Sequence, residues 1–491
     1  MNKIDISKNK ILFLGYGGVA KATLFYLDKY FKYDIKKVYL IDKCKTQFYG
    51  PLVSHVKARI CKHITTTNFC DILDEVGIKP GDIIIDLSTC TATYYFFKIC
   101  LEKGYNYINT SIEDGDDPFF GTSIDVQHKQ LIKIYKDVKK NQKIRCNVLT
   151  ECGQNPGMIQ HYILHGLNQM NKLRKKTTKD DYSKEALLKA VSSYKVGTIF
   201  CSEVDNMFMK KEIKNYKDMI YNTWSVSGLL DEGFDKTELV VGKGNKFIQP
   251  VFPKKMIDFN KMDIIPKDDD QEYQVIFLKD NGMNNTLASV CPMLNSSGEV
   301  VYKQYRGHLI HHGEMFEMAR YFGKKAPFMT YCYKINRDAE QSITNFFLNN
   351  QMNDDNDLSL RLLNKCGSFF VIDNIDKPEN EIVYCHDTIG ATFFCGTKKV
   401  ERAFWCGSIL SDADDIDRNF TPTIVQVAAG VLSGLSYIME PKNKNKGWVE
   451  PCHMDTKYIL NKAGPLLGKL FFTEIPPESL KDFSFDYKRK P

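Results

Sequence analysis

The sequence contains no Cys-x-x-Cys pair and no unbroken run of 18 apolar residues. Its 15 cysteines are scattered, and an odd number without metal-ligand spacing is typical of reduced thiols in a cytosol, not of a disulfide framework. Without a long apolar run, a membrane-spanning helix is not expected. The polar start, MNKIDISKNK, leads directly into an apolar stretch and leaves no room for a signal peptide. These absences predict a cytoplasmic protein that does not act in a membrane.

The chain also lacks a strong excess of either charge. Lys and Arg number 67 and Asp and Glu 60, which leaves a net charge of +7 over 491 residues. The lysine-rich stretches at 171–176 and 442–446 are typical of solvated helix ends or loops, and no basic stripe or recognition motif accompanies them. Nucleic-acid binding is therefore not expected. With 43% hydrophobic residues, this length instead predicts two or three packed domains.

Short apolar stretches alternate with helical patterns in the first 157 residues. This alternation is typical of a parallel α/β sheet of the Rossmann type, and we expect residues 1–157 to form such a domain. Strands are predicted at 10–15, 37–41, 82–87, 105–109 and 146–150, and helices at 19–29 and 94–103.

After Pro156 the pattern changes to amphipathic strands with fewer helices between them. We expect residues 158–421 to form an α+β domain with a mostly antiparallel sheet, extended at its C-terminus by 441–491. The apolar stretch 422–440 predicts a buried helix, and periodicity leaves open whether this helix packs on the first domain. The polar stretch 350–358 predicts an exposed loop or helix edge. The predicted strands of the second domain are 195–203, 237–242, 273–278, 299–304 and 328–334.

The segment Gly15–Ala20 matches G-x-G-x-x-A between a predicted strand and a predicted helix. Gly15 permits the tight turn, Gly17 allows the backbone to approach a pyrophosphate, and Ala20 keeps the helix close to the sheet. Asp42 ends the next strand, where a carboxylate binds ribose hydroxyls and disfavours a 2′-phosphate. NAD is therefore favoured; NADP, through Lys43 and Lys45, and a glycine turn without a ligand are the alternatives. The predicted cofactor contacts in this unit are Gly15, Gly17, Gly18, Val19, Ala20 and Asp42.

Four further segments carry polar groups that could do chemistry, and each also has an ordinary structural interpretation. Glu113 could be a surface acid, Trp224 a core residue, and the pair His311–His312 a structural or exposed one. The pair His161 and His165 lacks the glutamate of H-E-x-x-H and a third ligand, so no metal site is predicted. The four segments are Asn109–Glu113, Gly153–Met158, Asn222–Gly233 and His311–Glu314.

The order and wording of these motifs resemble the bacterial homospermidine synthases, and the resemblance covers nearly the whole chain. The string N-T-W-S-V-x-G…E-G at Asn222–Gly233 is its most specific piece. The matching segments are Gly15–Ala20, Asn109–Glu113, Gly153–Met158, Asn222–Gly233, Gly307–Glu314, Asp387–Gly390, Phe404–Ser408, Gln426–Met439 and Glu450–Asp455.

The resemblance implies a saccharopine dehydrogenase-like architecture, usually a homodimer, and a redox-neutral reaction with bound NAD. In that family putrescine loses a hydride to NAD, the amine of a second putrescine attacks the imine, ammonia leaves, and the hydride returns. The product is homospermidine, and spermidine can also serve as the aminobutyl donor. A diamine is a dication at neutral pH, so its pocket needs carboxylates.

The resemblance also assigns roles to individual residues. Catalytic roles are implied for Glu113, Asn155, Trp224, Glu232 and His312, with the Trp224 indole facing a cationic amine and His312 as a proton carrier. Diamine binding is implied for Glu113, Glu203, Trp224 and Asp387, and cofactor binding additionally for Ser88, Thr110, Asn155 and Pro156.

Three positions depart from the family pattern: Cys90, Cys152 and Gly313 stand where an Asp, a His and an Asn are usual. They bear on the preferred diamine more than on the reaction class. The alternative enzyme is a reductase of the saccharopine or carboxynorspermidine type, whose carboxylate-bearing substrates would require Arg or Lys in the pocket. The alternative of another class is a non-catalytic NAD-binding scaffold, which would have no need of Glu113, Trp224, Glu232 and His312.

Overall fold

The computed structural model divides the chain into two compact units. Met1–Met158 with Ile424–Leu466 form the first, and Ile159–Thr423 with Leu467–Pro491 form the second. The predicted exposed loop at 350–358 lies outside the described part of the chain. The structure describes residues 3–89, 91–113, 123–209, 220–252, 257, 271–349, 369–371, 382–414, 419–442 and 446–481.

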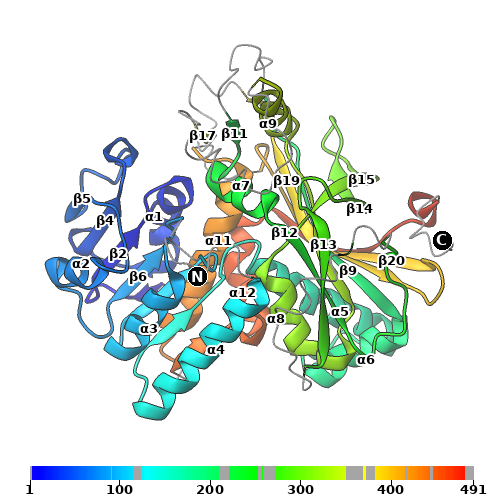
Figure 1. The fold of residues 1–491 in the computed structure, drawn as a ribbon, viewed down its shortest axis with the longest axis horizontal. Coiled ribbons are helices and arrows are strands. Elements are labelled where there is room, and N and C mark those ends of the chain that lie inside the picture. The colour runs from blue at the N-terminus through cyan, green and yellow to red at the C-terminus, as the bar shows by residue number, and fades with distance from the viewer. Residues whose placement is uncertain are drawn as a thin grey trace. The chain divides into compact units, whose positions relative to one another are not determined.

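A parallel sheet of seven strands forms the centre of the first unit (Figure 1). Its strands are short, apolar and fully buried near the middle, as the sequence predicts for a sheet covered on both faces. The chain order reverses between β2 and β6, and ligands of such sheets bind in the crevice at this point. In spatial order the strands are β21 (Gly447–Val449), β8 (Asn147–Leu149), β7 (Asn106–Asn109), β6 (Ile83–Asp86), β2 (Ile11–Leu14), β4 (Val38–Asp42) and β5 (Ala58–Cys61).

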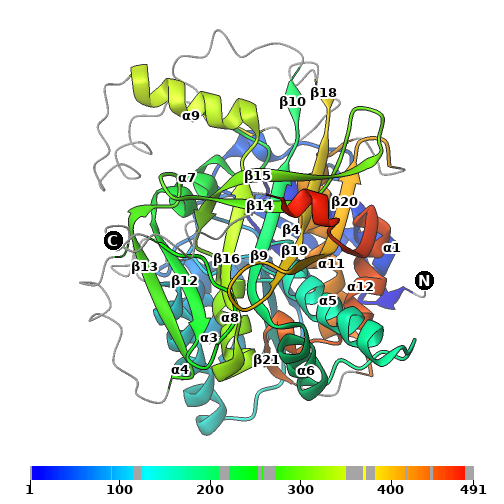
Figure 2. The same ribbon diagram turned by 90° about the vertical axis from the view of Figure 1, so that its right-hand side faces the viewer.

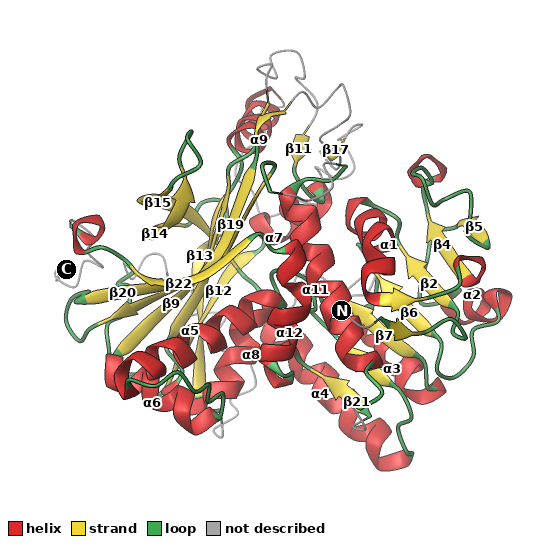
Figure 3. Cartoon of the chain, turned by 180° about the vertical axis from the view of Figure 1, so that it is seen from behind, coloured by secondary structure: helices red, strands yellow, loops and turns green. Residues whose placement is uncertain are grey.

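Helices cover both faces of this sheet (Figure 3). Side chains of α2, α3 and α4 join those of the strands in one hydrophobic core. On α11, Gly430 and Gly434 allow close packing, because a Cβ on Gly434 would lie 2.3 Å from Cys152 Sγ. The helices are α1 (Gly18–Tyr30), α2 (Phe69–Val76), α3 (Thr93–Lys103), α4 (Ile124–Asn141), α11 (Pro422–Met439) and α12 (Thr456–Ala463); β1 (Ile4–Asp5) and β3 (Phe31–Lys32) form a small separate pair.

The C-terminal part of the chain is divided differently from the prediction for 441–491. Residues up to Leu466 belong to the first unit, because β21 pairs with β8 in its sheet. The predicted buried helix at 422–440 is α11, and most of it belongs to the same unit, where Asn147 Nδ2 donates to the Ile438 carbonyl over 2.6 Å. By length and composition alone α11 could cross a membrane, but most of it is buried within the protein, as a core helix is.

A mixed, mostly antiparallel sheet forms the second unit (Figure 2). Among its described strands, only β9 and β16 pair in parallel. The predicted fold class, a Rossmann-like domain with an α+β partner, is confirmed. The main path runs β13 (Tyr273–Asn281), β12 (Lys236–Gly242), β16 (Phe328–Lys334), β9 (Val196–Asp205), β19 (His386–Cys395), β20 (Arg402–Ser411) and β22 (Lys469–Glu474), with β15 (Val300–Ile310) beside β16 and β14 (Thr286–Leu294) beside β15.

The two faces of this second sheet differ in chemistry. Successive residues of a strand point to opposite faces, so Phe200 and Val204 of β9 lie in the hydrophobic core, while Glu203 and Asp205 lie on the other face. The remaining elements are α5 (Met158–Lys175), α6 (Lys184–Tyr194), α7 (Val226–Phe234), α8 (Gly313–Phe322), α9 (Arg337–Asn349), and the short pairs β10 (Phe208–Met209) with β18 (Ile382–Tyr384) and β11 (Ile220–Asn222) with β17 (Phe369–Val371).

Candidate active site

The glycine loop after β2 has the geometry of a dinucleotide site. Gly15 adopts φ +77°, and a Cβ there would lie 2.7 Å from the carbonyl oxygen of Leu87, so the turn packs against the end of β6. Gly17 has no heavy atom within 4 Å of an added Cβ, which leaves open space above the loop. Helix α1 then begins at Gly18 without a side-chain cap. The free N–H groups of its first turn fit a pyrophosphate.

Asp42, at the end of β4, is held in place by two backbone groups. The N–H groups of Tyr16 and Cys44 donate to its two carboxylate oxygens over 2.8 Å and 2.7 Å. The first of these bonds ties the carboxylate to the glycine loop, and carboxylate oxygens retain further acceptor capacity for ribose hydroxyls. The position and charge of Asp42 therefore fit a dinucleotide without a 2′-phosphate.

The remaining predicted cofactor residues of the first unit lie where parallel strands end. Ser88 Oγ donates to buried Asp86 over 2.5 Å, which fixes the turn after β6. Thr110 follows β7 and packs against Gly153. The turn that carries Asn155 and Pro156 is closed by Gly153 N–H, which donates to the Pro156 carbonyl over 2.8 Å.

Glu113 belongs to the same edge of the first sheet. Ser111 Oγ donates to Glu113 Oε1 over 2.6 Å, and the Glu113 N–H donates to Thr93 Oγ1 over 2.9 Å. The carboxylate is half-buried and fixed by these bonds, so it is not a freely solvated surface acid. The neighbouring departure Cys90 lies outside the described residues, whereas Cys152 packs on α11.

In the second unit, the polar face of the sheet brings three buried carboxyl groups together. Asp387 on β19 stands directly opposite Asp205 on β9, and Glu203 is two residues before Asp205 on the same face. All three side chains are buried. The Tyr331 hydroxyl donates to Glu203 Oε2, and Thr223 Oγ1 donates to Asp205 Oδ2 over 2.5 Å.

Aromatic rings line the same face beside these acids. Tyr331 and Tyr333 of β16 stack with their ring centroids 5.6 Å apart. Trp224, just before α7, donates from its indole nitrogen to the Tyr333 hydroxyl over 3.2 Å. Trp224 is only half-buried, whereas Trp405 is fully enclosed in the opposite face's core. This partial exposure favours a ligand-facing role for Trp224 over the core interpretation.

His312 lies between two carboxylates. Its Nε2 is 3.1 Å from Glu232 Oε2 on α7, and its Nδ1 is 3.2 Å from Glu314 Oε2 on α8. Burial alone would lower the pKa of His312, but Glu314 and Glu232 outweigh burial and hold this pKa well above its ordinary value. The imidazole is therefore a buried imidazolium at neutral pH. Its ring contacts Tyr331, with centroids 4.2 Å apart, which joins this ion cluster to the three acids.

Within the described ranges, Asp205 and Asp387 on this face are not matched by basic side chains. In the described part of the chain, no Lys or Arg forms an ion pair with Asp205 or Asp387. Both carboxylate oxygens of Asp387 are buried without a hydrogen bond. Burial, with the nearby charges of Glu203 and Asp205, raises the pKa of Asp387 well above its usual range, and burial raises the pKa of Asp205 to about 6. The arrangement calls for a cation that the described residues do not supply.

Burial keeps both histidines of H-x-x-x-H neutral. His165 Nδ1 is 2.7 Å from the Tyr182 hydroxyl and its Nε2 is 2.9 Å from Gln169 Nε2. Burial lowers the pKa of His161 to about 3 and that of His165 to about 4. Among the residues that the structure describes, no group of three His, Cys, Asp or Glu side chains could hold a metal ion.

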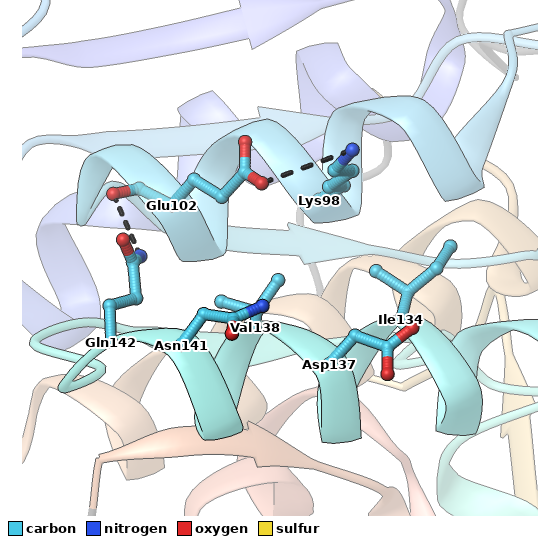
Figure 4. A pocket seen from close by; sticks show the side chains of 7 residues that line it. All are labelled: Lys98, Glu102, Ile134, Asp137, Val138, Asn141 and Gln142. Atoms are coloured by element: carbon cyan, nitrogen blue, oxygen red, sulfur yellow. Dashed lines mark hydrogen bonds and ion pairs between the residues drawn. The ribbon is translucent and has the colours of Figure 1, made fainter.

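A surface pocket between α3 and α4 is a separate feature of the first unit (Figure 4). Its residues lie in the C-terminal halves of the two helices, and helices of such units return toward the amino ends of the strands. The pocket is therefore at the edge opposite to the glycine loop and does not belong to the cofactor site. It is lined by Lys98, Glu102, Ile134, Asp137, Val138, Asn141 and Gln142.

Comparison with known proteins shows what the chain is similar to. Residues 11–151 match the saccharopine dehydrogenase NADP binding domain. Over 488 residues the chain is 25% identical to a homospermidine synthase of Mesorhizobium japonicum, which covers 95% of this chain and 91% of that protein. A homospermidine synthase of Blastochloris viridis is 24% identical over 473 residues, with coverages of 93% and 89%. The chain is a relative of the homospermidine synthases. The resemblance predicted from the order of the motifs is confirmed.

A solved structure agrees in fold. The crystal structure of the Legionella pneumophila homospermidine synthase in complex with NAD matches with a TM-score of 0.76 at 22% identity, covering 96% of this chain and 92% of that one. The agreement therefore extends beyond the Rossmann domain to both units of this homospermidine synthase relative.

The structure brings Glu203, Trp224, Glu232, His312 and Asp387 into one cluster of the second unit, and places Glu113 and Asn155 in the first. Sequence reasoning missed three members of the cluster. The available signal was a polar or aromatic residue at alternate positions of a predicted strand, as in Glu203-x-Asp205 and Tyr331-x-Tyr333. Glu314 was singled out in the segment His311–Glu314 but was given no role. The missed residues are Asp205, Tyr331 and Tyr333.

Proposed function

We propose that this chain is a homospermidine synthase that transfers an aminobutyl group between diamines without net redox change. The observation that supports this proposal most strongly is the sheet face on which Glu203, Asp205 and Asp387 are buried. Aromatic side chains line this face, and among the described residues no Lys or Arg forms an ion pair with Asp205 or Asp387. Dicationic putrescine or tricationic spermidine would supply the positive charge that these acids need. The near full-length similarity to two homospermidine synthases supports the same assignment.

The cofactor we propose is NAD, bound by the glycine loop of the first unit. The uncapped start of α1 and the open space at Gly17 fit the pyrophosphate, and Asp42 fits the adenosine ribose. Ser88, Thr110, Asn155 and Pro156 would contact the remainder of the dinucleotide. Bound NAD would accept a hydride from the amine-bearing carbon and later return it to the product imine.

Different residues of the second unit would bind the diamine, contact its cationic centre and donate a proton. Glu203 and Asp387 would bind the distal ammonium, and the Trp224 ring would face the cationic carbon–nitrogen centre, a contact worth roughly 1–2 kcal/mol when desolvated. His312, held as an imidazolium by Glu232 and Glu314, can donate a proton to the departing ammonia. Catalytic roles for Glu113 and Asn155 are proposed from the resemblance of their motifs alone.

Two alternatives are less well supported. A reductase of the saccharopine or carboxynorspermidine type would place Arg or Lys against substrate carboxylates, whereas this face offers acids and one imidazolium. A non-catalytic NAD-binding scaffold would have no reason to bury Asp387 without a partner. We further propose, from the family alone, that the protein works as a cytoplasmic homodimer.

A product assay tests the proposal. Purified protein is incubated with NAD and putrescine deuterated on both amine-bearing carbons, and homospermidine, ammonia and NADH are followed. We expect homospermidine and ammonia to appear in step, without accumulation of NADH, and the product to retain all of its deuterium even with unlabelled NADH present. Accumulation of NADH or a need for added NADPH would favour the reductase. Absence of product with putrescine, spermidine and other diamines would favour the scaffold.

A further inference from the structure

Asp205 is a buried acid for which the motif comparison assigned no role. It ends β9, directly opposite Asp387 of β19, with exposed fractions of 3% and 1%. Side chains directly opposite in an antiparallel pair have their Cβ atoms about 4.5–5.5 Å apart, and like charges at such a pair repel. Glu203 lies on the same face and adds a third carboxyl group.

Among the described residues, nothing compensates the charge of this pair. The titratable and charged groups of this part of the chain that face it are Glu203 of β9, Tyr333 of β16, Cys385 just before β19 and Asp338 of α9; the hydroxyl groups of Thr223 and Thr423 and the N–H of Thr388 add neutral donors. None of these carries a positive charge. The neighbouring His386 is neutral, because burial lowers its pKa to about 4. Lys334 is exposed, and its register partner Val204 lies on the other face of the sheet.

The two members of the pair are stabilised unequally. Asp205 accepts hydrogen bonds from Thr223 Oγ1 over 2.5 Å and from Met207 N–H over 3.1 Å. No donor has hydrogen-bonding geometry at either oxygen of Asp387, and the nearby Thr423 hydroxyl and Thr388 N–H only partly offset the rise in its pKa. Two buried carboxyl groups in this position cannot both be ionised without a cation, so the empty site must hold protons.

We propose that Asp205 and Asp387 form a proton-holding pair, and that a diammonium ion entering the site displaces their protons to solvent. Asp205 is thus a positioning residue that sets the charge of the diamine site, and the inference rests on the proposed function. Burial raises the pKa of Asp205 to about 6, so the exchange falls in a range that can be measured. Diamine affinity should fall as the pH drops through this range, because protons then compete with the ammonium group.

Calorimetry on the intact protein loaded with NADH, so that no hydride can leave the diamine, tests the proposal. Putrescine is titrated at pH 6 in two buffers of different ionisation enthalpy, and the difference in heat gives the number of protons released. Putrescine is fully protonated at this pH, so any proton must come from the protein. We expect release of about one proton per site in the wild type, and at least about half a proton less in Asp205→Asn.

A second variant keeps the test valid if Asp205→Asn folds poorly. Thr223→Val removes the hydrogen bond that lowers the pKa of Asp205, so the pH midpoint of diamine affinity should move upward. Glu340→Gln, an exposed acid of α9 beside His308, serves as the matched control and should behave as wild type. Putrescine binding without proton release would overturn the proposal. Equal proton release from the wild type and from Asp205→Asn would overturn it too, because the proton would then come from another group, such as His312. Absence of diamine binding and of homospermidine would instead contradict the proposed function.

Discussion

Asp86 in the first unit and Asp387 in the second are both buried carboxyl groups on central strands, but their surroundings differ. Asp86 accepts bonds from Ser88 Oγ over 2.5 Å and from the Tyr107 hydroxyl over 2.8 Å, so each of its oxygens has a partner. Asp387 has no donor in hydrogen-bonding geometry at either oxygen, is only weakly stabilised by Thr423 and Thr388, and faces two further acids. A carboxylate bonded within its own unit serves the structure, whereas one left unsatisfied in a cluster of acids is available to a ligand.

Both units also bury a histidine beside a carboxylate. His128 Nε2 of the first unit is 3.1 Å from Glu151. His312 of the second unit has a carboxylate at each ring nitrogen. The two acids at His312 lie next to a proton that can be donated.

The largest effects are expected from replacing Asp387 and Asp86 by asparagine. The first replacement should reduce activity and the second should reduce stability. Asp387→Asn is expected to lower kcat/KM for putrescine by roughly 100–1000-fold, because an ammonium group loses a buried partner, with unfolding free energy unchanged or higher. Asp86→Asn is expected to lower unfolding free energy by about 1–3 kcal/mol, because a network donor loses its acceptor. Steady-state kinetics and urea unfolding measure both. Equal loss of stability in the two variants would break the comparison.

Trp224 and Trp405 allow the same comparison between a ligand-binding residue and a structural one, with smaller expected effects on activity. Trp224→Ala should lower kcat/KM by roughly 10-fold, through the lost contact with a cation, and leave the fold intact. Trp405→Ala, in the enclosed core, should lower unfolding free energy by about 3–5 kcal/mol. Wholesale unfolding of Trp224→Ala in circular dichroism would return that residue to the core interpretation.

The ion cluster around His312 makes a prediction about pH. Glu314→Gln removes one of the two carboxylates that raise the pKa of His312, so the alkaline limb of the kcat profile should move down by roughly one pH unit. The stability that this raised pKa contributes is present below the unfolded pKa and is lost as pH rises through the folded pKa. That loss should therefore occur at lower pH in the variant. Glu317→Gln, one turn further on and bonded to Gln160, is the control; a profile shifted equally by both variants would refute the assignment.

The smallest effect is expected at Asp42. Asp42→Asn replaces one of the two carboxylate oxygens that accept hydrogen bonds from the Tyr16 and Cys44 N–H groups. The Kd for NAD should therefore rise about 5–10-fold, and the preference for NAD over NADP should weaken. Fluorescence titration with both dinucleotides measures this, with exposed Glu75→Gln as the control. Unchanged affinity and preference would remove Asp42 from the cofactor site.

The sequence predicted the first unit closely because its strands are short apolar runs between clear helices. The strand predicted at 37–41 is Val38–Asp42, and the helix at 19–29 is Gly18–Tyr30. The second sheet was harder: β14, β19, β20 and β22 were not predicted, and pairings such as Asp205 with Asp387 join residues far apart in the chain. Register of this kind depends on tertiary packing, which periodicity does not contain. The individual acids could therefore be predicted by resemblance, but their charge imbalance emerged only from the structure.

The central claim is that the acids of the second unit are reserved for a dication. The most direct measurement compares the binding of putrescine and butylamine, which lacks the distal ammonium, to the protein loaded with NADH. Isothermal titration at pH 8 should show putrescine binding at least about 100-fold more tightly, because the second ammonium gains buried carboxylate partners. Equal affinity for the two amines would contradict the account.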